Sequence, residues 1–566
     1  MVMTGRGWIA AGLAEPTLWV NGEQYRMVYN VQTTRYLPGK LIQEYNDENL
    51  NFTTELCYLT SRSVAIRSIV KNMSQKPVKV SFDWNGGVYE PTSVVSSIDK
   101  GLSFIRPKDS TNTVIRFLTA DKIQAVGSDS LHVTEKSEMT LEPGKTYQSE
   151  MTQTLTLRGE DTAKELAAIA TLNIDNCFEL NEQQWNAQIA SLLSGNSKYL
   201  KDNKYRKVLV KAMMTLNSNY RTPAGDILHG GSNPSYNGFI NGIWSWDSWK
   251  IASGNVHFNE EIAKSEMITL FDYQADNGMV PDFISYNKKY NNWRDAKPPV
   301  AAWGAMNVYK ATGDKKFLET MFDKLYKFHQ WWYAERDHNH NGICEYGSTD
   351  GTLIAACWES GMDNGVRFDD AVMQKNSEKA WSMNQENICL NSFLYVDKTI
   401  LAEMATLLNK PELAAQLNAE AKVIKEFVQT KMWDKETGFF YDTRIDTGEH
   451  IKVMGAECWL PLWAGIATPE QAKQVMQKMM DPQKFNSTLP LGTLDISHPR
   501  LRPVRGYWRG PVWVDQVYFG ITGLRNYGFD READILTEKF INNAQGLTTD
   551  GPIHELSLIH ISEPTR

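Results

Sequence analysis

The sequence predicts two folded parts, an antiparallel β-sandwich followed by a ring of helical hairpins. In the first third of the chain, short apolar runs alternate with turn residues, which is typical of antiparallel strands. From about residue 201 the apolar period changes to 3.6, which indicates amphipathic helices. Long loops rich in Gly, Pro, Asn and Trp separate many of these helices, and such loops in a compact helical domain usually carry function.

The β-sandwich is expected over residues 1–160. Its clearest signal is 17–20 running into Asn21-Gly22, because both central residues of that hairpin turn need positive φ. Further strand-like segments are 64–70, 78–84, 113–118 and 149–157. No obvious first strand precedes them, so we expect this domain to be truncated at its N-terminus.

A helical linker is expected over residues 161–200, and the catalytic ring of helices over 201–555. The segments with helical periodicity in the ring are 205–216, 260–273, 300–310, 317–332, 400–408, 412–432, 471–480, 512–524 and 531–543. Residues 556–566 break this pattern and are interpreted as a non-native tail. We therefore expect the parent chain to continue beyond Glu555, and the absence of a signal peptide carries no information on location.

The composition excludes several classes of protein. A net charge of −8 without clustered Lys and Arg argues against a nucleic-acid surface. No run of about 18 apolar residues occurs, so no membrane span is expected. The 18 Trp residues either fill a large helical core or provide ring faces for sugars, whose C–H faces stack on aromatic rings. The six Cys residues show no zinc-binding spacing.

The loop 358–364, Trp-Glu-Ser-Gly-Met-Asp-Asn, is a candidate for sugar-cleaving chemistry. Cleavage of a glycosidic bond needs two carboxyl groups, one that protonates the leaving oxygen and one that activates water or attacks the sugar. This loop offers Glu359 and Asp363 beside Trp358. The alternative is that Asp363 caps the start of a helix.

Three other Trp-rich stretches accompany this loop, at 238–250, 292–299 and 506–513. Their alternative interpretation is structural, with helix starts, capping by Asp247 and buried Trp rings. Arg509 could orient a carboxylate, because the planar guanidinium of arginine can donate two parallel hydrogen bonds to it. Together with the loop 358–364, they supply these candidate substrate-binding residues: Trp244, Trp246, Asp247, Arg294, Lys297, Trp358, Glu359, Trp508 and Arg509.

These four stretches, together with Asp-Gly-Pro-Ile-His-Glu at 550–555, resemble glycoside hydrolase family 63 and its bacterial α-glucosidases. The resemblance runs from about Leu18 and is densest over 206–555. It implies a β-sandwich followed by an (α/α)6 barrel, here incomplete at the C-terminus, and cleavage with inversion. It also implies Asp363 as general acid and Glu555 as general base, although the family's motif does not continue after Glu555.

The chemistry sets requirements for this pair. Asp363 has to be protonated, so we expect burial or nearby Glu359 to raise its pKa, whereas Glu555 has to be ionised. An inverting pair leaves room for a water, with carboxyl groups roughly 6.5–9.5 Å apart. Residues 363 and 555 lie 192 positions apart, so only the closed ring can bring them together.

A calcium site is expected in the loop 337–345, Asp-His-Asn-His-Asn-Gly-Ile-Cys-Glu. Oxygen-bearing side chains recur at alternate positions around a Gly, as in the first half of a calcium-binding loop. The alternative is an Asn/Gly turn after a helix that ends near Arg336. The resemblance favours calcium with a structural role, and the expected ligands are Asp337, Asn339, Asn341, Glu345 and the carbonyl of Ile343.

The expected function is therefore that of an inverting, exo-acting α-glucosidase that hydrolyses small oligosaccharides or α-glucosides. The alternatives are a trehalase or a hydrolase of glucosylglycerate or mannosylglycerate, and, in another class, a non-catalytic carbohydrate-binding protein. The parent enzyme is expected to be periplasmic or secreted. The sequence leaves the linkage, the aglycone and the oligomeric state open.

Overall fold

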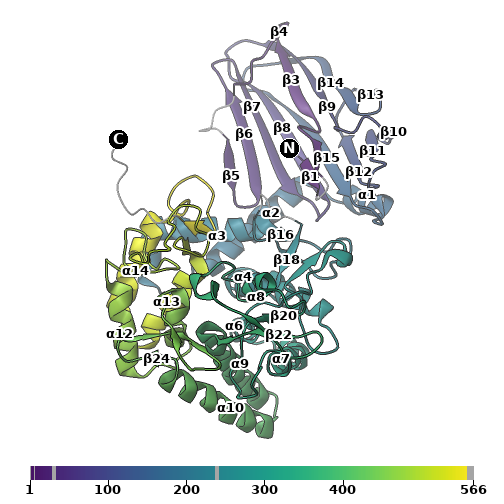
Figure 1. Cartoon of the computed structure of the whole chain (residues 1–566). Coiled ribbons are helices and arrows are strands. Elements are labelled where there is room, and N and C mark those ends of the chain that lie inside the picture. The colour runs from purple at the N-terminus through teal and green to yellow at the C-terminus, as the bar shows by residue number, and fades with distance from the viewer. Residues whose placement is uncertain (1, 5–6, 29–33, 236–240, 558–566) are drawn as a thin grey trace. The chain divides into compact units, whose positions relative to one another are not determined.

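The computed structural model describes residues 2–4, 7–28, 34–235 and 241–557. The chain divides into two compact units, 1–191 and 192–566 (Figure 1). Residues 558–566 of the predicted non-native tail and 238–240 of one Trp-rich stretch lie outside the described residues.

The first unit is built from antiparallel sheets, as predicted. The larger sheet has the order β10 (Val94–Ile98), β11 (Gly101–Ile105), β12 (Asn112–Phe117), β15 (Thr146–Thr156), β8 (Ser63–Asn72), β7 (Leu50–Tyr58), β6 (Lys40–Asn46) and β5 (Arg35–Leu37). The smaller sheet has the order β13 (Lys122–Val126), β14 (Ser130–Leu141), β9 (Val78–Gly87), β3 (Glu15–Val20) and β4 (Glu23–Gln24). The strands β1 (Val2–Thr4) and β2 (Gly7–Ala10) form a separate pair.

One apolar core joins the two large sheets. The alternating buried side chains of β9 belong to the same cluster as those of β7, β11 and β12. Phe52 of the larger sheet meets Phe82 of the smaller one edge to face, with ring centroids 5.9 Å apart. The predicted hairpin at Asn21-Gly22 joins β3 to β4, and both residues have the positive φ that this turn requires (52° and 86°).

Two helices, α1 (Thr162–Ala170) and α2 (Ile174–Leu192), follow the last strand of the sandwich. The side chain of Asp161 caps α1 by accepting a hydrogen bond from the backbone N–H of Lys164. These two helices cover most of the segment 161–200 in which a helical linker is expected.

The second unit is helical, and each segment predicted there as a helix overlaps an α-helix, although residues 512–513 form a strand and 271–273 a 3-10 turn. Its helices are α3 (Asn203–Asn219), α4 (Ser245–Asn255), α5 (Glu260–Thr269), α6 (Ala301–Thr312), α7 (Lys315–Glu335), α8 (Leu353–Glu359), α9 (Ile388–Leu407), α10 (Pro411–Thr430), α11 (Leu460–Trp463), α12 (Pro469–Met480), α13 (Val514–Asn526) and α14 (Asp530–Asn543). The predicted segments did not include α4, α8 and α11, of which α8 and α11 are too short for several periods of an apolar pattern.

Short elements fill the loops of this unit. The 3-10 turns are Lys198–Lys201, Phe271–Tyr273, Lys288–Tyr290, Val366–Phe368 and Ala456–Trp459. The strands are β16 (Tyr220–Arg221), β17 (Gly231–Ser232), β18 (Gly242–Trp244), β19 (Phe283–Ser285), β20 (Gly347–Ser348), β21 (Met373–Lys375), β22 (Trp381–Met383), β23 (Gln385–Glu386), β24 (Trp433–Asp434), β25 (Phe439–Phe440), β26 (Asp442–Arg444), β27 (His450–Ile451), β28 (Val512–Trp513) and β29 (Leu556–Ser557).

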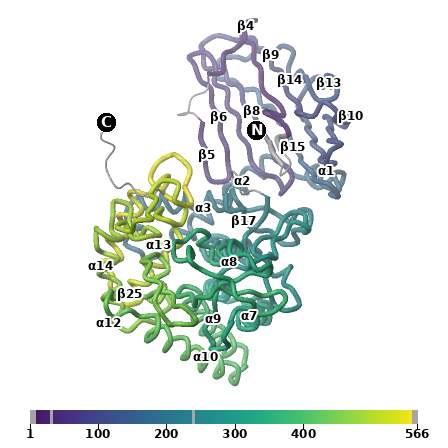
Figure 2. Tube along the Cα trace, in the orientation of Figure 1, coloured from purple at the N-terminus to yellow at the C-terminus, as the bar shows by residue number. Residues whose placement is uncertain are grey.

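The beginning and the end of the helical unit meet. The Tyr199 hydroxyl, just before α3, donates to Asp534 of α14 at 2.8 Å, and Lys211 of α3 donates to the carbonyl of Thr549 at 2.6 Å. Figure 2 shows α3 close to the yellow C-terminal part of the trace. Among the described residues, no helix combines the length and the apolar character needed to cross a membrane.

Candidate active site

The first two residues of the segment 358–364 are the last two of helix α8, which ends at Glu359, and a loop follows. Gly361 continues the loop with a φ of +67°, a conformation that favours glycine. A Cβ atom on Gly361 would lie 2.3 Å from the ring of Trp246, so steric overlap also excludes a side chain at this position. This close approach holds the loop against helix α4, which carries Trp246.

Asp363 does not cap a helix. The 3-10 turn that follows begins after Gly365, and Asp363 lies in the loop before it. The Tyr507 hydroxyl donates to Asp363 Oδ2 at 3.2 Å. Burial raises the pKa of Asp363 and the charge of Asp282 adds to this, while Lys297 and the Tyr507 hydrogen bond oppose it.

Tyr507 is a site residue that the sequence analysis missed. Its φ is +59°, an uncommon conformation for a bulky residue, and such strain often occurs at functional sites. Trp513 stabilises it by donating from its indole N–H to the Tyr507 carbonyl at 3.0 Å. Burial and the charge of Asp363 raise the pKa of Tyr507, so the hydroxyl stays protonated and available as a donor.

Glu359 offers no surface to a substrate in this structure, contrary to its predicted role as a binding residue. The residue is fully buried, and its carboxylate accepts two hydrogen bonds of 2.8 Å from the guanidinium of Arg336. It also accepts from the backbone N–H of Gly347 at 2.6 Å and of Ala296 at 3.2 Å. Its role is to join helix α8 to Arg336, at the end of helix α7, and burial rather than Glu359 is the main cause of the raised pKa of Asp363.

Lys297 is a buried cation beside the loop that carries Asp363. Its amine lies 3.2 Å from Asp282 and 3.7 Å from Asp295, and it donates to the carbonyl of Trp358. Burial disfavours the charged amine, but the carboxylates of Asp282 and Asp295 outweigh this and raise its pKa. Lys297 is therefore a permanent positive charge at the site.

A second charged cluster surrounds Lys250 on helix α4. Its amine lies 2.8 Å from Asp515, 3.6 Å from Asp247 and 3.4 Å from the centre of the Trp246 ring. Burial raises the pKa of Asp247, and the charge of Asp515 adds to it, while Lys250 opposes it. Lys250 and Asp515 were absent from the predicted site.

Glu555 lies at the edge of this second cluster. The two residues after it form β29, which pairs with β28 and so fixes the segment against the loop 506–513. The residue as a whole is exposed, yet loss of water around its carboxyl, followed by the charges of Asp247, Asp515 and Asp363, raises its pKa to about 7. Lys250 opposes this shift. Glu555 and Asp363 are thus close enough for their charges to interact.

Arg509 links the loop of Asp363 to the loop 506–513. Its Nε donates to the Asn364 carbonyl at 2.8 Å, and its guanidinium pairs with Asp369. The Asn364 side chain in turn accepts from the backbone N–H of Trp508 at 2.9 Å. Arg509 therefore pairs with a carboxylate, as its residue type indicated, and that carboxylate is Asp369.

The predicted Trp residues differ in how much ring they expose. Trp508 is buried and stacks on Trp513, with centroids 4.0 Å apart, and buried Trp246 is covered by Lys250 and Gly361. These two rings have no free face for a sugar, which corrects the prediction that they bind substrate. Trp244 and Trp358 are only partly buried and keep accessible surface.

Arg294 also comes from a predicted stretch, and its contacts are local. Its Nε lies 2.6 Å from a carboxylate oxygen of Asp350, and it donates to Thr352 at 3.0 Å. The guanidinium lies 5.0 Å from the centre of the Trp358 ring. The side chain keeps an exposed fraction of 39%, so a ligand above Trp358 can still reach it.

The loop 337–345 has the geometry of a ligand-binding turn. Asp337 accepts from the backbone N–H groups of Asn341 and Gly342 at 3.0 and 2.9 Å, and Glu345 is fully buried. Glu345 Oε1 has no hydrogen-bond partner, although it is shielded from water. An orphaned carboxylate oxygen inside a turn fits a site for a hard cation.

A further carboxylate completes this loop. Glu386 is buried and accepts from the side chain of Asn341 at 2.8 Å. Burial raises the pKa values of both Glu345 and Glu386, and the charge of Asp337 adds to each shift. No three His, Cys, Asp or Glu side chains of the described residues are by themselves arranged to hold a metal, so asparagine and carbonyl oxygens would have to take part.

The helical unit is similar to known protein families and proteins. A family model described as the mannosylglycerate hydrolase MGH1-like glycoside hydrolase domain matches residues 241–556. Mannosylglycerate hydrolases from Rubrobacter radiotolerans and Thermus thermophilus are 28% and 26% identical, over 53% and 50% of this chain and 82% of each relative. The cytosolic neutral trehalase of Saccharomyces cerevisiae is 23% identical over 52% of this chain and 46% of its own length.

A solved structure gives a similar match. The family 63 mannosylglycerate hydrolase from a strain of Thermus thermophilus, in complex with glucose, is 24% identical with a TM-score of 0.49. The alignment covers 59% of this chain and 90% of that one.

Proposed function

The chain belongs to the MGH1-like glycoside hydrolases of family 63, and from this premise we propose that it hydrolyses small α-glycosides by general acid–base catalysis with inversion. The observation that carries the proposal is that Asp363 and Glu555 both approach the loop 506–513, where Tyr507 donates to Asp363 and β28 pairs with the strand that directly follows Glu555. They lie far apart in the sequence, in two charged clusters of the helical unit, yet their charges interact.

In this proposal Asp363 is the general acid. Burial favours its protonated form, as an acid that donates to a leaving oxygen requires. Tyr507 is a positioning residue, because its hydroxyl holds one carboxyl oxygen and leaves the other for the glycosidic oxygen. Lys297 limits the rise in pKa and keeps the proton transferable.

Glu555 is the general base in this proposal. A pKa of about 7 leaves the carboxyl partly ionised at neutral pH and makes it more basic than an ordinary glutamate. Lys250 opposes the three neighbouring carboxylates and so preserves the ionised form that accepts a proton from water. Trp244 and Trp358 offer the surface on which a sugar ring can stack.

The arrangement of the helical hairpins in a closed ring is also part of the proposal. We infer an (α/α)6 barrel, because the first part of the unit, at Tyr199 and α3, contacts its last part, at α14 and the loop that follows. Such closure would also explain how Asp363, Lys250 and Glu555 come together from separate hairpins.

The substrate is proposed to be a small α-glucoside cleaved from its end. A second candidate is an α-glycoside with an acidic aglycone, such as glucosylglycerate or mannosylglycerate. It is favoured by four arginines within residues 500–509 of a chain whose net charge is −8. Arg509 of this segment is hydrogen-bonded to the loop of Asp363.

A substrate panel tests the function. Nigerose, kojibiose, trehalose, glucosylglycerate and mannosylglycerate are incubated with the protein and the released sugars are measured. We expect release of glucose or mannose from at least one of them. Binding of these compounds without cleavage of any would support a carbohydrate-binding protein instead.

We also propose that the loop 337–345 binds calcium in a structural role. The ligands would be oxygens of Asp337, Asn339, Asn341 and Glu345 and the carbonyl of Ile343, with Glu386 as a further carboxylate. The orphaned Glu345 Oε1 supports this assignment. A bound Ca²⁺ would neutralise three buried acids that now oppose one another.

Calorimetric titration with Ca²⁺ after chelation tests this proposal. We expect one site and a higher melting temperature with calcium, because an ion that binds only the folded state stabilises it. Glu345→Gln should lose both effects, and Glu319→Gln, at an exposed position of α7, should retain them. A chelated protein that shows no heat of binding would remove the calcium site.

A further inference from the structure

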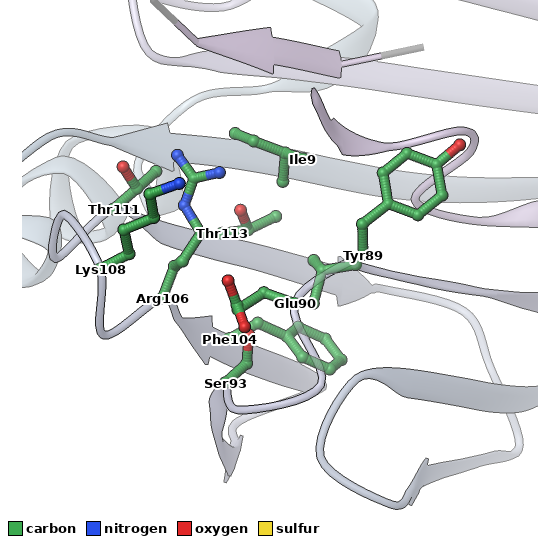
Figure 3. A pocket seen from close by; sticks show the side chains of 10 residues that line it. Ile9, Tyr89, Glu90, Ser93, Phe104, Arg106, Lys108, Thr111 and Thr113 are labelled. Atoms are coloured by element: carbon green, nitrogen blue, oxygen red, sulfur yellow. The ribbon is translucent and has the colours of Figure 1, made fainter. Parts of the chain in front are cut away.

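One pocket lies within the first unit and is lined by none of the residues of the proposed mechanism. It has a volume of about 180 Å³ and opens between strands β2 and β11 and the loops after β9 and β11 (Figure 3). This is the space open to the centres of water molecules, and one water needs about 10–15 Å³ of such space, so the pocket has room for roughly a dozen water-sized groups. A single small ligand of about a dozen non-hydrogen atoms would fill it.

The walls of this pocket carry a mixed set of polar groups. Figure 3 shows Arg106 and Lys108 together on one side and Glu90 and Ser93 together on another. Arg106 is held in place by Asp109, whose carboxylate accepts from its Nε at 3.0 Å. The exposed Lys108, in contrast, has no protein partner among the described residues.

Ser93 gives an independent indication of a ligand. It is only 6% exposed, and its hydroxyl is buried without a hydrogen-bond partner. A buried hydroxyl without a partner is unfavourable, so such groups are normally hydrogen-bonded to protein, water or ligand. The pocket that Ser93 lines is where that partner can lie.

The charges of the pocket decide between ligand classes. Asp109 neutralises Arg106, and the walls add one cation, Lys108, and one anion, Glu90, so the lining carries no net positive charge that would favour an anion. They do offer donors and acceptors at close range, beside the apolar surfaces of Phe104 and Ile9. The Tyr89 ring is 56% exposed at the same pocket. Hydroxyl partners beside an aromatic ring are the features that recognise a sugar or polyol.

We propose that this pocket is a second, non-catalytic binding site of the protein, for one neutral monosaccharide or polyol of similar size. Glu90 accepts from vicinal hydroxyl groups of the ligand, Lys108 donates to them, and the Ser93 hydroxyl completes the set. The proposal stands apart from the catalytic function, because it uses none of the residues of the acid–base pair.

The test uses the whole protein labelled at isoleucine methyl groups and titrated with D-glucose, D-mannose and D-glucitol. Ile9 lines the pocket, and its NMR signal is assigned by its loss in Ile9→Val. We expect a saturable shift of the Ile9 signal with at least one of the three probes. Glu90→Gln and Lys108→Met should weaken that binding roughly tenfold each, the effect of about 1.4 kcal/mol.

Glu142→Gln is the matched control, since Glu142 is exposed in the same unit and lies outside the pocket. It should leave the binding constant unchanged. An Ile9 signal that stays fixed while isoleucines of the second unit respond would overturn the proposal. So would binding that both pocket variants leave intact, or a response of Ile9 to phosphate but to none of the three probes.

Discussion

Replacing Asp363 with asparagine is expected to lower kcat/KM by roughly 10²–10⁴-fold, the contribution typical of a general acid. Asparagine keeps the size of the side chain and the acceptor for the Tyr507 hydroxyl, but it has no proton to give to a leaving oxygen. The loss should appear mainly in kcat, because the groups that bind the sugar are unchanged. Steady-state kinetics on the best substrate of the panel measures it.

Asp370→Asn is the control for this variant. Asp370 is exposed, lies seven positions further along the same segment, and belongs to neither charged cluster. Its replacement should leave kcat/KM near the wild-type value. An Asp363→Asn protein that keeps wild-type turnover would show that the acid is another group.

Replacing Glu359 with glutamine is expected to destabilise the helical unit by about 3–5 kcal/mol, as breaking a buried ion pair does. The change leaves the guanidinium of Arg336 buried without its counter-charge, since both residues are fully shielded from water. It also weakens the acceptor for two backbone N–H groups. Denaturant unfolding followed by tryptophan fluorescence measures the loss.

Glu378→Gln provides the comparison, because Glu378 is exposed and its replacement should change stability by no more than about 0.5 kcal/mol. If Glu359→Gln unfolded at the same denaturant concentration as this control but lost substrate affinity, Glu359 would be a binding residue after all. The structural role assigned here would then be wrong.

The Glu359 result shows why a local motif did not reveal a residue's role. Its sequence neighbours, Trp358 and Asp363, made it look like a catalytic carboxylate. Its partner Arg336 lies 23 residues earlier, at the end of another helix, and no local pattern indicates that pairing. Whether a carboxylate is buried depends on tertiary packing, whereas apolar periodicity shows only which face of a helix is apolar.

The elements themselves were predictable because their signals are local. An apolar period of 3.6 residues locates α7 and α10. The turn between β3 and β4 requires two residues with positive φ, and the pair Asn21-Gly22 readily adopts it. The resemblance of the motifs to a known family located Asp363 and Glu555. The structure adds that the charge of Asp363 contributes to the raised pKa of Glu555, after burial and the charges of Asp247 and Asp515.

The missed residues act across long separations. Tyr507 meets Asp363 from 144 residues away, and Lys250 meets Asp515 across 265. Glu386 joins the loop 337–345 through Asn341, 45 residues earlier. The positive φ of Tyr507 has no sequence signal either, because the residue type does not favour it. These contacts join residues from different helices and loops, which no local pattern in the sequence relates.

The central claim is that Asp363 and Glu555 act as acid and base on opposite sides of one glycosidic bond, with a water between Glu555 and the sugar. The anomer released first from the best substrate, followed by ¹H NMR before mutarotation, tests it most directly. The account predicts that an α-glycoside yields the β-anomer. Initial release of the α-anomer would contradict it, because retention requires a carboxylate that attacks the sugar instead of activating water.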